Sequence, residues 1–141
     1  MNVIIFGLTA AVIYFLVAVR LATLLKESDS AIEHKSLMRA VIVVALATHG
    51  ASLHPHLFQG DELNLGIYTS VSLVSWIVVS IITLGINLRS IASLAVVILP
   101  LTSLTVLLSL VFSNQNLVPY SPATSIHIAT SITAYSLFTI A

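Results

Sequence analysis

The sequence predicts an all-α integral membrane protein, a polytopic bundle of about five transmembrane helices in a single domain over residues 1–141. The first observation is composition: 58% of the residues are hydrophobic and only 7% are charged, whereas a soluble domain is about a quarter charged. The second is that five apolar runs approach the roughly 20 residues that a helix needs to cross the hydrocarbon core. The third is that the connections between the runs are short, which favours antiparallel packing of successive helices in contact with the lipid bilayer.

The spans are expected near residues 3–25, 37–57, 65–86, 90–112 and 122–141. The first is not a secretory signal peptide, because no basic residue precedes it and no cleavage-like site follows it. Pro55 is expected to end the second helix. Asp61 and Glu62 precede the third, where carboxylates complement the helix dipole.

Two further signals lie in the last two spans. Pro100 removes a backbone donor inside the fourth span, and Thr102 and Ser103 are available to satisfy the freed carbonyl. Ser121 followed by Pro122 is an N-cap with proline at the first helical position, which predicts the start of the fifth helix. The chain stops directly after "SLFTIA", and we expect it to be the N-terminal part of a longer protein.

Basic residues predict the orientation. All five flank the first or third connection of the five-span arrangement: Arg20, Lys26, Lys35, Arg39 and Arg89. The positive-inside rule assigns these connections to the cytoplasm, so the N-terminus should lie outside. His54 and His56 then lie on the outer face, where we interpret them as exposed polar residues.

Several function classes are disfavoured. The formal net charge is zero and no basic patch suggests nucleic acid. The absence of cysteine excludes thiol chemistry and a Cys-x-x-Cys-His haem attachment in this sequence. No Gly-rich phosphate loop, catalytic Ser/His/Asp spacing or intramembrane carboxylate relay is found, so an enzyme with its whole active site in this chain is not expected.

The candidate site residues are His127, His49 and Trp76. Ionisable residues inside a span are costly and often mark a site, although a neutral imidazole that hydrogen-bonds a neighbouring helix is the simpler alternative. His127 should lie about 7 Å below the outer face at 1.5 Å per residue, with His49 deeper. Two histidines on different helices can ligate a haem iron, whereas a zinc site would lack ligands. Trp76 could stack on a planar ligand or simply pack.

Three motifs, in order and spacing, resemble the cytochrome c assembly protein family, the CcsA and HemX-like membrane proteins. They are "ATHGASL" at 47–53, "NLGIYTSVSLVSW" at 64–76 and "IHIATSITAYSLFTIA" at 126–141. The tryptophan-rich haem segment of the family is absent, which is expected either if that segment follows residue 141 or if the chain belongs to the HemX-like branch. The synthase members' Tyr-Glu-Ser triplet is replaced by Tyr68-Thr69-Ser70, which favours the HemX-like branch.

The resemblance implies a multi-pass protein of the bacterial inner membrane that binds or handles haem b near the outer face. His127 matches an outward-facing haem histidine of that family, and His49 matches a histidine of the HemX-like branch. Apocytochrome c and other cytochrome assembly proteins are the implied partners. Two alternatives stay open: a b-type haem electron-transfer anchor with a partner dehydrogenase, and an accessory membrane protein without a cofactor.

Overall fold

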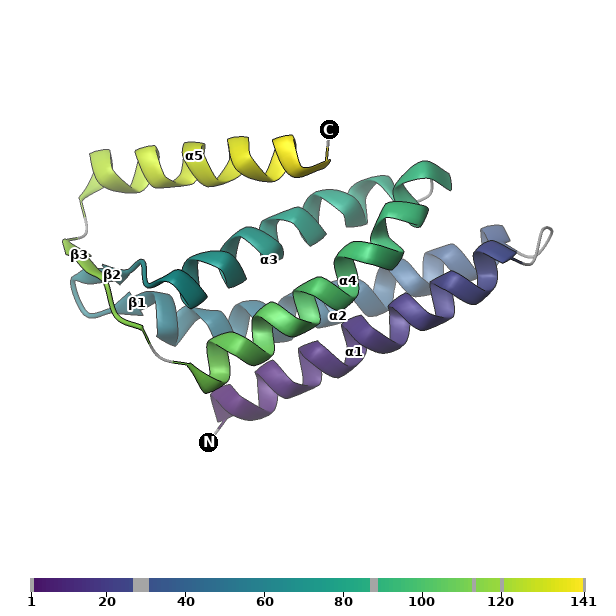
Figure 1. Cartoon of the computed structure of the whole chain (residues 1–141), viewed down its shortest axis with the longest axis horizontal. Coiled ribbons are helices and arrows are strands. Elements are labelled where there is room, and N and C mark those ends of the chain that lie inside the picture. The colour runs from purple at the N-terminus through teal and green to yellow at the C-terminus, as the bar shows by residue number, and fades with distance from the viewer. Residues whose placement is uncertain (1, 27–30, 87–88, 113, 120, 141) are drawn as a thin grey trace.

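A computed structural model describes residues 2–26, 31–86, 89–112, 114–119 and 121–140, in which five helices and three short strands form (Figure 1). The helices are α1 (Asn2–Lys26), α2 (Ala31–Leu57), α3 (Ile67–Gly85), α4 (Arg89–Val111) and α5 (Pro122–Ile140). The strands are β1 (Phe58–Gln59), β2 (Glu62–Asn64) and β3 (Leu117–Pro119). The predicted all-α helical bundle is therefore confirmed.

Four helices are long and apolar enough to cross a membrane, namely α1, α3 and the segments Ser36–Leu57 of α2 and Ile91–Val111 of α4. The fifth predicted helix also forms, but α5 is not among these four because its many hydroxyl side chains and His127 lower its hydropathy. Membrane insertion of the first four helices follows from length and composition, whereas a crossing by α5 stays a prediction.

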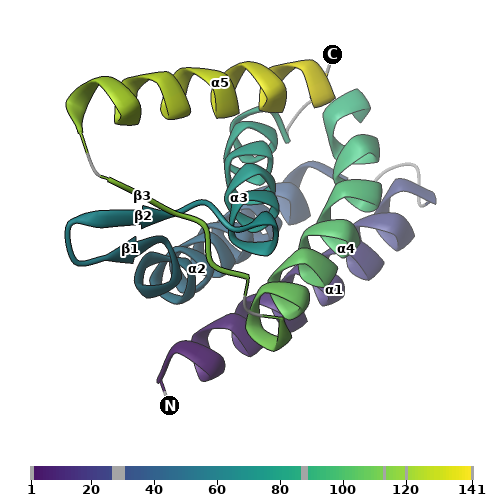
Figure 2. The ribbon, with the colours of Figure 1, turned by 60° about the vertical axis from the view of Figure 1, so that its left-hand side comes forward.

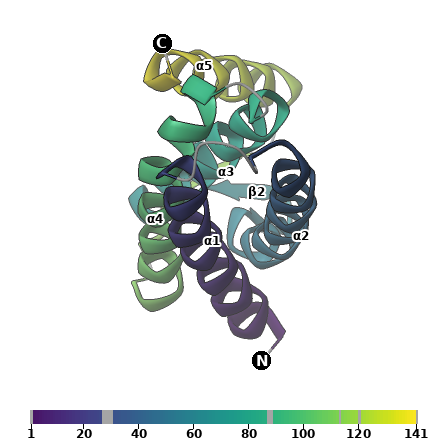
Figure 3. The ribbon, with the colours of Figure 1, turned by 90° about the vertical axis from the view of Figure 1, so that its right-hand side faces the viewer.

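The helices pack in a definite order. α1 lies against both α2 and α4, and α3 lies against α2 and α4 (Figure 2). α5 packs along α3, on the side of α3 that faces away from α1 (Figure 3). Small residues allow close approach: a Cβ on Gly7 would lie 2.7 Å from Leu110 Cδ1 and 2.8 Å from Ser52 Oγ. Such close contacts replace the hydrophobic driving force that is absent between helices in lipid.

A small antiparallel sheet at one end of the bundle was not predicted. β1 pairs with β2 through a two-residue turn in which Gly60 has φ 64°, as in a type II′ hairpin, and β2 pairs with β3. The Asn64 side-chain oxygen accepts hydrogen bonds from the backbone N–H groups of Gly66 (2.9 Å) and Asn116 (3.0 Å). The α2–α3 and α4–α5 connections are thus joined to each other rather than forming separate loops.

Of the predictions made for prolines and helix caps, the structure confirms the cap of α5 and contradicts the two that concern Pro55 and Pro100. Ser121 caps α5 as predicted, since its Oγ accepts from the Thr124 N–H at 3.1 Å. The expected end of α2 at Pro55 is wrong: the helix continues to Leu57, because a proline in the last turn removes only one hydrogen bond. Thr102 and Ser103 were expected to satisfy the carbonyl freed by Pro100, but Thr102 Oγ1 has no hydrogen-bond partner, and the Ser103 hydroxyl donates to the Ala11 carbonyl of α1 at 2.9 Å.

The charge distribution follows the alternating direction of the helices. The last turn of α1 and the first turns of α2 and α4 lie at one end of the bundle, and the basic positions are at or near these turns (Figure 1). The N-terminus and the sheet lie at the opposite end. We refer to the sheet end as the outer end, in keeping with the predicted orientation.

Candidate functional site

His49 lies in the interior of the bundle, with 1% of its surface exposed. Its Nε2 lies 2.9 Å from Ser72 Oγ of α3, and its Nδ1 lies 3.4 Å from the Tyr14 hydroxyl of α1. The Tyr14 and His49 rings also meet edge to face, with centroids 5.8 Å apart. Both ring nitrogens therefore have partners, and His49 connects three helices.

The sequence brings these groups together through helical spacing. Tyr14 belongs to the buried stripe of α1 that includes Gly7, Ala11 and Ala18, and Ser72 belongs to the buried face of α3. Residues three and four apart share a helix face, so these positions face the centre of the bundle. Ligation of a haem iron by His49 would break at least one of its two hydrogen bonds and would need space that the packed surroundings do not offer.

Trp76 bridges α3 and α2. Its indole N–H donates to the Leu46 carbonyl at 2.9 Å. A Cβ on Gly50 would lie 3.5 to 3.6 Å from the indole ring, an ordinary van der Waals distance, so the ring packs beside α2 at this position. The observed role of Trp76 is interhelical packing with a satisfied polar tip.

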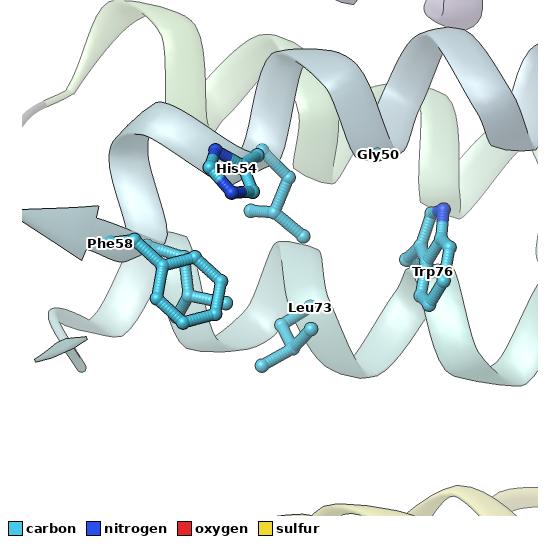
Figure 4. Close-up of a pocket in the computed structure, with 7 residues that line it drawn as sticks. Gly50, His54, Phe58, Leu73 and Trp76 are labelled. Atoms are coloured by element: carbon cyan, nitrogen blue, oxygen red, sulfur yellow. The ribbon is translucent and has the colours of Figure 1, made fainter. Parts of the chain in front are cut away.

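An apolar pocket of about 170 Å³ extends from Trp76 along the α2–α3 seam toward the outer end (Figure 4). Its walls are Gly50, Leu53, His54, Leu57, Phe58, Leu73 and Trp76. The volume is below the roughly 300 Å³ at which sites for drug-sized ligands begin, so the pocket alone cannot enclose a porphyrin. It can accommodate the edge of a ring or one short apolar group.

His54 is a wall residue of this pocket that sequence reasoning assigned only to the exposed surface. Its ring is exposed on one side and lies 5.0 Å, centroid to centroid, from the ring of Phe58. The sequence does place His54 four residues after Gly50, and this spacing puts both residues on the face of α2 that meets Trp76.

His127 lies on α5 with its side chain exposed. Within the described part of the chain, no hydrogen bond to its imidazole is found, in contrast to His49. The backbone carbonyl of His127 accepts from Thr130, but both ring nitrogens are open to a ligand that approaches α5 from outside the bundle.

The three predicted site residues do not form one site. His49 and Trp76 both lie on the α2–α3 seam, whereas His127 is on α5, which packs along α3. Among the described residues, no group of three or more His, Asp or Glu side chains could hold a metal ion. Of the two histidines, only His127 has no hydrogen bond to its ring nitrogens among the described residues.

Comparison of the chain with protein-family models, with curated proteins and with solved structures finds no significant match. The resemblance to the cytochrome c assembly family therefore stays a prediction that rests on the three sequence motifs.

Proposed function

We propose that the chain is a membrane protein of cytochrome c assembly that binds haem b near the outer face of a bacterial inner membrane. The observation that carries the proposal is the open imidazole of His127, located on α5 about 7 Å along the helix from its start at the outer end. An imidazole with no partner in an apolar setting is available to donate a lone pair to a metal. Haem, when bound, would supply an iron that accepts this lone pair.

The residues have separate roles in this proposal. His127 would bind the haem iron through one ring nitrogen, and its second nitrogen would donate to a hydroxyl or carbonyl of a neighbouring segment. His49 holds α1, α2 and α3 together and is not assigned to the iron, because both of its nitrogens are bonded. Apocytochrome c or another assembly protein would receive the haem at this end.

Absorption spectra of the purified chain, oxidised and reduced, test the proposal after haem supplementation. We expect a b-type spectrum in the wild type that is lost in His127→Ala and retained in the matched variant His54→Ala, which removes another exposed imidazole at the same end. Retention of the full spectrum in His127→Ala would refute the assignment.

A cofactor-free accessory role is the second candidate, favoured by the saturated hydrogen bonding of His49. Preparations that stay colourless at every haem concentration would support it. A b-type electron-transfer anchor is distinguished by reduction of the bound haem by a quinol.

A further inference from the structure

The pocket on the α2–α3 seam has a defined depth in the membrane. We call it the α2–α3 slot, and its walls are Gly50, Leu53, His54, Leu57, Phe58, Leu73 and Trp76. α3 begins at Ile67 at the outer end, and Trp76 lies nine residues further along, about 14 Å deeper at 1.5 Å per residue. One half of the hydrocarbon core is about 15 Å thick. The slot therefore spans one leaflet, from the outer end to near the middle of the membrane (Figure 4).

The α2–α3 slot is apolar and open at the surface of the bundle. Its accessible lining is almost entirely apolar, and Leu53 is the one buried residue among its walls. Among the described residues, none outside α2, α3 and β1 lines it. An apolar cavity of about 150 Å³ is large enough to bind benzene, so the slot has room for roughly six carbon atoms of a chain.

A lipid chain is the occupant that fits this slot and is present at this depth. An empty groove is unfavourable, because the side chains that line it lack dispersion contacts on one side. A transmembrane helix, about 10 Å across, is too wide to enter. Lipid chains are as apolar as the walls, so the binding energy comes from close packing in the slot rather than from a hydrophobic driving force.

The charged side chains next to the slot are acidic. Asp61 and Glu62 belong to the hairpin that begins at Phe58, which is a wall residue of the slot. The sequence has no lysine or arginine between Arg39 and Arg89, the segment that contains α3 and the hairpin. A lipid headgroup that has an ammonium group is therefore attracted to the mouth of the slot, whereas a headgroup with a net negative charge is repelled.

We propose that the α2–α3 slot binds one acyl chain of a phospholipid of the leaflet at the outer end, and that the lipid has a phosphoethanolamine headgroup. The chain lies along the seam with its end near Trp76. The ammonium group lies beside the carboxylates of Asp61 and Glu62. This site is independent of the proposed haem site, because His127 is not among its residues.

Trp76 reports on occupancy of the slot, because it is the single tryptophan and bromine quenches the fluorescence of an indole that it touches. The whole chain in phosphatidylglycerol nanodiscs is titrated with phosphatidylethanolamine that has bromine near the end of one acyl chain. We expect quenching with a relative binding constant of roughly 1.5 to 5 over brominated phosphatidylglycerol, as for one exposed ion pair. A constant of one or below would overturn the headgroup assignment. No quenching by either lipid would show that something else covers the slot and would overturn the whole proposal.

Two neighbouring positions of α2 separate the slot from the surrounding lipid. Gly50→Leu adds a side chain inside the slot, and Ala51→Leu adds one at an exposed position outside it. In fully brominated bilayers we expect most of the quenching to be lost in Gly50→Leu and to be kept in Ala51→Leu. Equal quenching in the two variants would mean ordinary exchange with surrounding lipid and would contradict the proposal. The wild-type titration decides independently if Gly50→Leu does not fold.

Removal of the carboxylates tests the headgroup contact alone. The double variant Asp61→Asn, Glu62→Gln should reduce the relative binding constant to about one, because no net charge then remains beside the mouth to attract the ammonium group. The quenching itself should persist, since the apolar walls are unchanged. A preference that survives the double substitution would refute the assigned role of these carboxylates.

Discussion

The hydrogen bond between His49 and Ser72 should contribute measurably to the stability of the bundle. Ser72→Ala removes the 2.9 Å contact to Nε2 and leaves that nitrogen without a partner on a side chain that is 1% exposed. Interhelical polar contacts in membranes average about 0.6 kcal/mol and reach about 1.7 kcal/mol. An orphaned buried group costs about 1–3 kcal/mol.

These values place the expected loss in the free energy of unfolding at about 1–2 kcal/mol, which corresponds to roughly 5–30-fold in the folding equilibrium. Tyr14→Phe should cost less, because its hydrogen bond to Nδ1, at 3.4 Å, is longer and therefore weaker than the 2.9 Å bond between Ser72 and Nε2. Ser80→Ala is the matched control, since the Ser80 hydroxyl donates only to the Trp76 carbonyl of its own helix, and it should change the free energy by less than about 0.5 kcal/mol.

Equilibrium unfolding by SDS titration in mixed micelles measures these differences. Trp76 is the single tryptophan of the sequence and contacts α2, so its fluorescence reports directly on separation of α2 from α3. If Ser72→Ala unfolds at the same SDS fraction as Ser80→Ala, the His49–Ser72 bond does not stabilise the bundle and the reasoning is refuted.

Two further predictions concern the outer end and the orientation. Gly66→Ala should destabilise the chain by on the order of 2 kcal/mol, because the new Cβ would collide with the backbone carbonyl of Asn114; thermal unfolding measures this, and an unchanged midpoint would contradict it. The sequence contains no cysteine, so single cysteines can report topology without background. Gln59→Cys should react with a membrane-impermeant maleimide in intact cells and Lys26→Cys only after permeabilisation; the reverse pattern would overturn the predicted orientation.

The helices were predictable because each is specified by its own composition. The apolar runs are long enough to identify α1 to α4 without any tertiary information, and Ser121 with Pro122 marks the start of α5 within one residue. The strands were not predictable, since segments of two or three residues have no readable alternation. β2 and β3 exist because they pair with each other across some fifty residues of sequence, from Leu63 to Val118.

The site was predictable only in part for the same reason. His49 was recognised as an ionisable residue inside a span, and the structure confirms that it is buried. Its partners Tyr14 and Ser72 are 35 and 23 residues away, so no local pattern connects them to it. The wall position of His54 depends on how α2 meets α3, which the sequence does not specify by itself.

The outer sheet also has a consequence for the order in which the chain assembles. Helices that insert independently associate side by side afterwards. β3 can pair with β2 only when α3 and α4 already lie antiparallel, because the two connections are otherwise held apart by the length of two helices. Strand pairing at the water-exposed end is therefore a late event in folding. Hydrogen exchange at the Leu63 amide monitors formation of the β2–β3 hydrogen bonds, and would therefore show when the four-helix unit is complete.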